Sequence, residues 1–327
     1  RRQRQMCIRD RFTNIIQEEN EMAITAAQVK ELREMTGAGM MDCKKALTAT
    51  EGDMDKAVEF LREKGLATAQ KKASRVAAEG LCKTLVSEDG KKAVVVEVNA
   101  ETDFVAKNDS FMDFVKACAN TIIEQNPADV EALLTLKATG SEQTIAEMLQ
   151  EKVLTIGENI QIRRFERMEG ACVAYVHAGG KIGVLVNFDT DLAAKPEFVA
   201  YGKDVAMQIA ALRPQYTSRD EVSADYIAHE KEILMAQIQN DPKESQKPEK
   251  VIQGMIQGRI NKELKEICLL DQVYVKAEDG KQSVAQYVAQ VAKANNATVA
   301  VKGFVRFETG EGMEKKEEDF AAEVAKQ

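Results

Sequence analysis

Apolar residues recur at spacings of three and four near the start of the chain and predict three short helices. The helices lie between residues 24 and 65 and are separated by the breaks TGAG and EGD. Thr25 and Asp53 stand where N-caps belong, and Gly65 stands where the third helix would end. The apolar positions are Val29, Leu32, Met40, Ala46, Leu47, Val58 and Leu61. The pattern predicts a three-helix bundle, followed by a linker or an isolated helical turn.

The next part of the chain contains an internal repeat with an offset of 90 residues. Each copy consists of a strand, a turn with glycine, a second strand and an amphipathic helix, which is typical of a hairpin backed by a helix. The matching parts are EGLCKTLV (79–86) with EGACVAYV (169–176), VVVEVN (94–99) with VLVNFD (184–189), the helices 110–124 and 197–212, and Val115 with Val205. The repeat predicts two similar lobes of α+β structure, joined by a helical connector at 129–155.

A helical segment from Arg219 to Cys268 interrupts the second lobe. Two amphipathic stretches flank the loop NDPKESQKP, and this short proline-bounded loop makes their apolar stripes face each other. The stripes are Val222, Tyr226, Ile233, Leu234 and Ile238, then Ile252, Met255, Ile256, Ile260, Leu264 and Ile267. An antiparallel helical hairpin is the expected structure.

The remainder of the chain completes the second lobe. A helix capped by Ser283 and the alternating strand TVAVKGFVRFE are expected there, and the last nine residues form a short helix with Phe320 on its apolar side. The expected divisions are a non-native or disordered extension (1–21), helical bundle (22–66), linker (67–78), first lobe (79–165), second lobe (166–212 and 271–308), coiled-coil hairpin (213–270) and C-terminal module (309–327).

Composition narrows the class of protein. The 327 residues carry a formal net charge of -8, which argues against coating a phosphate backbone and so against direct nucleic-acid binding. No apolar stretch approaches the ~20 residues needed to span a bilayer, so no membrane contact is expected. The six cysteines lie far apart without a CxxC pair, which predicts reduced thiols in a cytoplasm rather than zinc ligands or disulfides.

Catalytic patterns are scarce. The chain has two histidines and no GxSxG, HExxH or P-loop motif, and TGAGMMDCKKA lacks the GK[ST] ending of a phosphate cradle. His229 lies among charges on a helix, which predicts a solvated face, while His177 lies at a strand-turn tip and stays ambiguous. A hydrolase or transferase that uses His177 would need a second catalytic group, and none is visible in the sequence.

The stretch NAETDFVAKND, residues 99–109, connects a predicted strand to a predicted helix. In one interpretation Phe104 packs beneath the following helix, Asp103 completes a turn, and Asn108 or Ser110 caps the helix. In the other, the strand end holds Phe104 outward to enter a partner's pocket, with the carboxylate of Asp103 competing for polar or metal contacts there. The residues alone leave both open.

Two segments carry a family resemblance. LREMTGAGMMDCKKAL (32–47) and EVNAETDFVAK (97–107) closely resemble the signature segments of the bacterial elongation factor Ts family, the nucleotide exchange factors of elongation factor Tu. The similarity runs from about Met22 to the C-terminus and includes IGENIQIRR (156–164) and the tail DFAAEVA. The first 21 residues fall outside it.

The resemblance implies an α+β fold: a ubiquitin-associated-like bundle, two repeated lobes, an inserted antiparallel coiled coil and a short C-terminal helix. It also implies that the bundle docks on a GTPase domain and that Phe104 is wedged between partner side chains near a magnesium site. His177 precedes AGGK, a turn of variable length in the family. The implied partner-binding residues are Arg33, Met40, Met41, Thr102, Asp103, Phe104, Val105, Ile156, Gly157, His177 and Phe320.

The expected activity is exchange without covalent catalysis. The implied partner is elongation factor Tu, GDP-bound and nucleotide-free, and the chain would act on GDP, GTP and magnesium only indirectly, with no cofactor or metal of its own. Met40 and Met41 admit a second interpretation as packing residues, because methionine fills cores as readily as it lines interfaces. An alternative function is a ubiquitin-like-binding helical adaptor, which only the bundle suggests.

Overall fold

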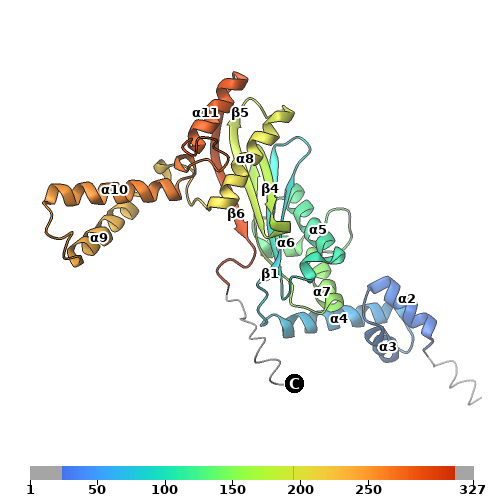
Figure 1. Ribbon diagram of the computed structural model, residues 1–327. Coiled ribbons are helices and arrows are strands. Elements are labelled where there is room, and N and C mark those ends of the chain that lie inside the picture. Colours follow the sequence, from blue (N-terminus) through green and yellow to red (C-terminus); the bar gives the residue numbers. More distant parts are fainter. Residues whose placement is uncertain (1–23, 194, 314–327) are drawn as a thin grey trace, which may run out of the picture.

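The computed structural model describes residues 24–193 and 195–313, and it is an α+β structure with N-terminal helices and two small antiparallel sheets. Figure 1 shows the N-terminal helices at one end of an elongated core, and a helical hairpin that projects away from that core. The expected α+β class is confirmed. The segments 1–21 and 314–327, with the predicted extension and C-terminal helix, lie outside the described residues.

Three helices form the N-terminal bundle, as predicted. Thr25 begins the first with a capping box to Gln28, Gly37 ends it in the left-handed region at φ 65°, and Asp53 caps the third. Buried apolar side chains from all three helices meet in one cluster, which includes Leu32, Leu47 and Leu61. The helices are α2 (Ala26–Thr36), α3 (Met40–Ala49) and α4 (Met54–Lys72).

The predicted end of the third helix is wrong. Helix α4 continues through Gly65 to Lys72, so the first part of the expected linker is helical. Gly65 is buried against the connector helix α7 (Ile145–Ile156), where an added Cβ would lie 3.5 Å from the carbonyl oxygen of Gln150. A Cβ at this distance would make an ordinary van der Waals contact, so the position accepts a small residue, and the glycine does not stop the helix.

Two three-stranded sheets form the core of the part of the chain that the structure describes. Both are antiparallel, with strand orders β1-β2-β3 and β4-β5-β6. The strands are β1 (Glu79–Val86), β2 (Lys92–Ala100), β3 (Gln161–Glu169), β4 (Ala171–His177), β5 (Ile182–Thr190) and β6 (Val299–Glu308). Strand β3 spans the expected division at 165/166 and belongs to the first sheet.

The predicted repeat is confirmed in the strands. Leu81 pairs with Val98 in the first sheet, and Ala171 pairs with Phe188 in the second, which is the same register 90 residues later. The register shift after Glu97 in β2 recurs after Asn187 in β5. Each lobe therefore has the same bulge, whose extra residue lies in the strand paired with the central one: Arg163 in β3 and Lys302 in β6.

The helices of the two lobes do not keep the 90-residue offset. Helices α5 (Asp109–Gln125) and α8 (Pro196–Leu212) each have 17 residues and begin 87 positions apart. Val115 therefore corresponds to Gly202, and the expected match with Val205 is wrong by one helical turn. The loop between strand and helix is shorter in the second lobe, which a comparison of strands cannot detect.

Burial along the central strands shows a layered core. In β2, Val94, Val96 and Val98 pack in the cluster of α5, whereas Ala93 and Val95 pack in a cluster shared with the other sheet. In β5, Val184 and Val186 face the cluster of α8, and Leu185 joins the shared cluster. Because side chains alternate along a strand, the layers run α5, first sheet, second sheet, α8.

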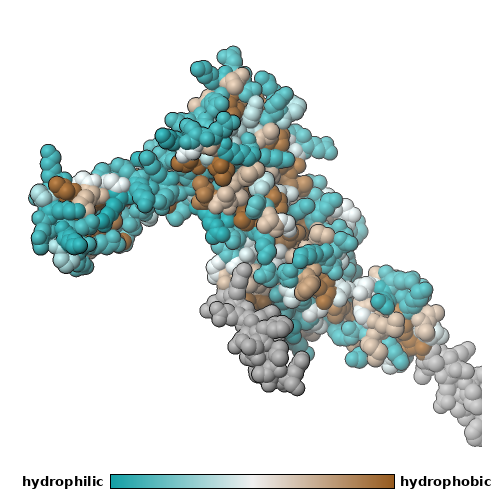
Figure 2. Space-filling view, in the orientation of Figure 1, coloured by the Kyte–Doolittle hydropathy of each residue, from teal (hydrophilic) through white to brown (hydrophobic). Residues whose placement is uncertain are grey.

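The helical connector and the inserted hairpin are as predicted. The hairpin helices bury one shared apolar cluster, and Ile233 is the predicted stripe residue that this cluster leaves exposed. Figure 2 shows that the outer surface of the hairpin is largely hydrophilic. The helices are α6 (Val130–Thr135), α7 (Ile145–Ile156), α9 (Ala224–Asn240), α10 (Glu249–Ile267) and α11 (Val284–Asn295). Among the described residues, no helix is long and apolar enough to cross a membrane.

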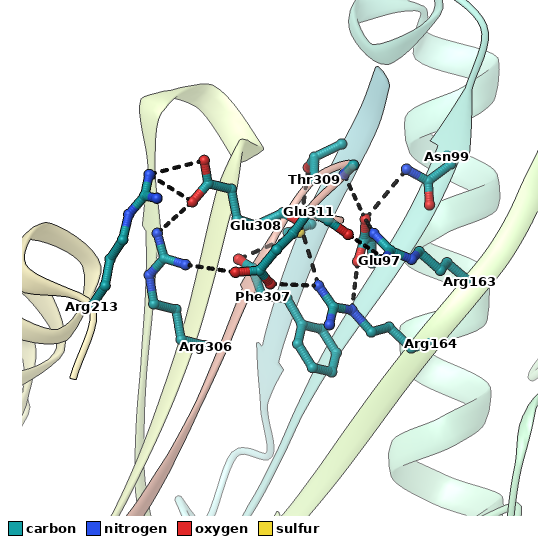
Figure 3. Close-up of polar contacts among 12 residues, drawn as sticks. Glu97, Asn99, Arg163, Arg164, Arg213, Arg306, Phe307, Glu308, Thr309 and Glu311 are labelled. Carbon is teal, nitrogen blue, oxygen red and sulfur yellow. Dashed lines mark hydrogen bonds and ion pairs between the residues drawn. The ribbon is translucent and has the colours of Figure 1, made fainter. Parts of the chain in front are cut away.

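A buried polar network joins the two lobes (Figure 3). Glu97 of β2 is fully buried, and its carboxylate accepts hydrogen bonds from Arg163 Nη1 at 3.0 Å, Arg164 Nε at 2.6 Å and the backbone N–H of Gly310 at 2.8 Å. The guanidinium of Arg164 also lies 4.2 Å from the ring centre of Phe307 in β6. The network therefore ties β2 and β3 of the first sheet to the end of the second.

The thiols in the described part of the chain are buried and free, at Cys43, Cys82, Cys118, Cys172 and Cys268. Burial raises the pKa of Cys118 to about 12 and the pKa of Cys82 and of Cys172 to about 11. A raised thiol pKa means that the folded state holds the proton more tightly than the unfolded chain does. The resulting stability is full below the unfolded pKa of ~8.5 and is lost as the pH rises toward the folded values.

We therefore expect the free energy of unfolding to fall by a few kcal/mol between about pH 9 and pH 11, measured by urea denaturation at each pH. The variant Cys118→Ala removes the most strongly shifted of these thiols, so it should flatten this pH dependence even where it lowers the absolute stability. A variant whose stability declines with pH as steeply as the parent's would contradict the assignment.

Candidate functional site

The tip between β2 and α5 presents Phe104 to solvent. Phe104 is 79% exposed, whereas the next residue, Val105, is buried in the core cluster of the first lobe. The alternative in which Phe104 packs beneath the following helix is therefore wrong, and the outward interpretation describes its position. We call residues 101–105 the tip.

Local hydrogen bonds hold the tip on its helix side. Asn108 caps α5, because its Oδ1 accepts the backbone N–H groups of Ser110 at 2.9 Å and Phe111 at 3.3 Å. Asp103 forms an ion pair of 3.0 Å with Lys107, whose Nζ lies 5.9 Å from the centre of the Phe104 ring. The predicted cap at Asn108 is confirmed, and a short turn sets where Phe104 leaves the surface.

A second loop holds the tip on its strand side. Helix α7 ends at Ile156, and Gly157 at φ 85° turns the chain so that residues 158–159 run beside the tip. Glu158 accepts the backbone N–H of Thr102 at 3.0 Å and its hydroxyl at 2.7 Å. In return, Glu101 accepts the backbone N–H of Asn159 at 2.6 Å. We call these four residues, Glu101, Thr102, Glu158 and Asn159, the clasp.

The end of α4 is attached to the same loop. Asn159 donates from its side chain to the carbonyl oxygen of Arg75 at 2.7 Å, and Lys72 donates to the carbonyl oxygen of Gly157. Arg75 also forms an ion pair of 3.5 Å with Glu101. Burial, followed by the charge of Arg75, lowers the pKa of Lys72. The N-terminal bundle is therefore connected to the tip through this loop.

A groove of about 510 Å³ lies between the bundle and the tip. Its walls come from the bundle, the tip and α7, which brings Phe104, Val105 and Ile156 of the predicted set to one place. The lining residues are Gly37, Phe104, Val105, Asn108, Ser110, Glu151, Lys152, Thr155 and Ile156.

The bundle carries a second apolar surface. Met40 and Met41 are 56% and 65% exposed, so the structure does not use them as core packing. Arg33 of α2 is also exposed. Met35, which the sequence analysis did not select, is also exposed. Spacing gave no signal for this exposure, because Met35 lies three residues from the buried Leu32 and three from the buried Ala38. The hydrophobic colour over the N-terminal helices in Figure 2 agrees with these exposures.

His177 belongs to the second lobe. It ends β4, and its Nδ1 lies 2.9 Å from the Tyr175 hydroxyl. The following turn packs on β1 at Gly180, where φ is 103° and an added Cβ would lie 1.8 Å from Leu81 Cδ1. His229 is exposed on α9, as predicted, and Phe320 lies outside the described residues.

These observations define a class of protein. An exposed aromatic ring on a braced tip, a groove beside it and exposed methionines on an attached bundle are typical of proteins that act by contact with another protein. In the described part of the chain, no three His, Cys, Asp or Glu side chains are grouped so that they could hold a metal ion.

Comparison with known proteins identifies the family. Residues 101–311 match the family model described as Elongation factor TS. Elongation factor Ts of Clostridioides difficile is 52% identical over 307 residues, covering 93% of this chain and 98% of that protein. That of Trichlorobacter lovleyi is 50% identical over 311 residues, with the same two coverages.

The chain belongs to the elongation factor Ts family. The resemblance seen in the sequence is thereby confirmed, and so is the expectation of a translation elongation factor of the exchange type rather than an enzyme.

Proposed function

We propose that this chain is the exchange factor of elongation factor Tu: it binds the GDP-bound form and promotes GDP release by disturbing the magnesium and phosphate site, so that GTP can load. The observation that carries the proposal is the exposed ring of Phe104 on a tip fixed from both sides. This work would take place in the cytoplasm.

The thermodynamic requirement is differential binding. An exchange factor binds the nucleotide-free GTPase more tightly than the nucleotide-bound one, and linkage makes the weakening mutual. Acceleration of release by ~10⁴-fold needs a barrier lower by roughly 5.5 kcal/mol. Burial of one Phe side chain supplies only about 1.5 to 3 kcal/mol, so Phe104 needs help from a wider interface.

The wider interface would include the rest of the predicted set. Val105 and Ile156 line the groove beside Phe104, and the proposed contacts Thr102, Asp103 and Gly157 adjoin these residues in the chain. The exposed methionines of the bundle offer a second docking point. His177 and Phe320 are further proposed contacts. Loss of magnesium ligation by the β-phosphate of GDP is the coupled event that we assign to the tip.

The direct test uses elongation factor Tu loaded with a fluorescent GDP analogue. The purified chain and excess unlabelled GDP are added, and the fluorescence decay is followed by stopped flow. We expect release to accelerate with the concentration of this chain until it saturates. A decay rate equal to that of elongation factor Tu alone at every concentration would refute the proposed function.

The bundle methionines are expected to supply docking affinity. The double variant Met40→Ala, Met41→Ala should weaken binding to nucleotide-free elongation factor Tu by about 5- to 10-fold, because few interface side chains cost more than ~1 kcal/mol on truncation. Isothermal titration calorimetry measures the dissociation constant. The control Ile233→Ala removes a partly exposed side chain from the hairpin and should bind as the parent does. Equal dissociation constants for all three proteins would exclude the docking role.

A further inference from the structure

The clasp is reciprocal, which distinguishes it from ordinary loop contacts. Each of its two segments supplies one carboxylate to a backbone N–H of the other: Glu158 to Thr102, and Glu101 to Asn159. The Thr102 hydroxyl donates the third bond of the clasp, to Glu158 at 2.7 Å. The bonded residues are 56 residues apart in one pair and 58 in the other. Because the two loops are bonded at two adjacent positions, both the distance between the loops and their relative orientation are fixed.

The bonds of the clasp are of the strong kind. All three have a carboxylate oxygen as acceptor, and hydrogen bonds to carboxylates are roughly twice as strong as those between neutral groups. Asn159 is 3% exposed, and the Glu101 side chain is 23% exposed, so water competes little for these positions. Two cations lie on the α4 side of the loop: Arg75 forms an ion pair of 3.5 Å with Glu101, and Lys72 donates to the carbonyl oxygen of Gly157.

The position of the clasp connects both contact surfaces. Thr102 is two residues before Phe104, so its two bonds set the direction in which the tip leaves β2. Asn159 also holds the end of α4 through the Arg75 carbonyl group, and α4 is part of the bundle that carries Met40 and Met41. The same loop therefore fixes the tip and the bundle relative to each other.

We propose that Glu158 and Glu101 are positioning residues for exchange: they hold the Phe104 tip at the angle that lets it enter the partner while the bundle is docked. The inference rests on the proposed function and deepens it. The two acids act through Thr102 and Asn159, and contact with the nucleotide site is left to the tip. Without the clasp the bundle still binds, and the ring arrives in the wrong orientation.

The test separates the release rate at saturation from the concentration needed to reach it. Glu158→Gln and Thr102→Val each weaken the clasp without removing a large side chain. Both should lower the saturating rate of GDP release by about tenfold, because a small misplacement of the Phe104 ring weakens its contact with the partner. The half-saturating concentration should change less than threefold. Thr102→Ser keeps the hydroxyl and should restore the parent rate.

Two further variants complete the design. The double variant Glu158→Gln, Thr102→Val should be no slower than the slower single variant, since the hydroxyl bond that Thr102→Val removes is one of the two bonds that Glu158→Gln weakens. The control Thr135→Val removes an exposed hydroxyl that bonds only within its own helix, to the Ala132 carbonyl at 2.8 Å, and should leave the rate unchanged. Thermal denaturation of every variant tests whether the fold is retained.

The possible failures are distinguishable. A parent chain that does not accelerate release refutes the proposed function, and the positioning role with it. An active parent with clasp variants of equal saturating rate overturns the positioning role alone. An active parent whose clasp variants lose affinity but keep the saturating rate also overturns it, because that result makes the clasp part of the docking surface.

Discussion

Replacement of Phe104 by alanine is expected to slow GDP release from elongation factor Tu, at saturating concentrations of this chain, by about 10- to 100-fold. Burial of a phenylalanine side chain stabilises a contact by about 1.5 to 3 kcal/mol, and each 1.36 kcal/mol on a barrier is a factor of ten in rate. The ring is 79% exposed in the free protein, so its removal takes almost nothing from the core. The loss should therefore appear in the exchange rate and not in the folding stability.

Stopped-flow release of a fluorescent GDP analogue measures the rate, and urea denaturation measures the stability. Val251→Ala on the hairpin is the matched control, because it also truncates an exposed apolar side chain but lies far from the tip in the sequence and on another module. Phe104→Leu should fall between parent and alanine. A Phe104→Ala protein as fast as the parent would remove the tip from the mechanism while leaving family membership untouched.

The fold could be predicted where local pattern and repetition agree. The bundle caps at Thr25 and Asp53 and the hairpin stripes follow from short-range spacing, which the sequence displays directly. The internal repeat predicted the two lobes correctly, because the strands of both lobes pair in the same register. It failed for the helices, because the shorter second loop moves α8 by almost one turn relative to α5.

Gly65 shows why local rules can fail. A glycine in a helical pattern is a stop signal only when the chain turns there, and here α7 packs on the glycine and α4 continues. Its contact in α7, Gln150, lies 85 positions further along the chain, so the contact has no local signature. Tertiary packing outweighed a cost of about 1 kcal/mol for glycine inside a helix.

The aromatic residue of the candidate site could be predicted from the sequence, but the residues that hold it in place could not. The position of Phe104 between a strand and a helix limited it to two orientations, and the buried alternative was excluded only by the structure. The clasp acids could not be paired from sequence, because Glu101 and Glu158 lie in segments that look independent until α7 brings them together. Residues that hold a functional side chain in place are in general harder to find than the side chain itself.

Glu97 gives the second large expected effect. Its alanine variant should lower the free energy of unfolding by about 3 kcal/mol, because Arg163 and the Gly310 N–H lose a buried acceptor, while Arg164 keeps its ion pair with Glu311. Glu97 is fully buried and bonds Arg163, Arg164 and Gly310, which are 66, 67 and 213 residues away in sequence. The pKa of Arg164 is raised: burial works against its charge, but the bonds to Glu97 and Glu311 outweigh burial.

The same change should loosen the joint between the lobes. Because Gly310 and Arg164 link β2 and β3 to the end of β6, we expect Glu97→Ala to speed amide hydrogen exchange in β6 more than in α2 and α3, which lie outside the network. Urea denaturation measures the global loss. Glu169→Ala is the matched control: this acid also pairs with an arginine of β3, Arg167 at 2.7 Å, but its side chain is 67% exposed, and such pairs contribute only about 0 to 1 kcal/mol. An equally small decrease in the free energy of unfolding for both variants would show that the buried network does not hold the two lobes together. The contact between the lobes would then depend on the shared apolar cluster that includes Cys82 and Leu185.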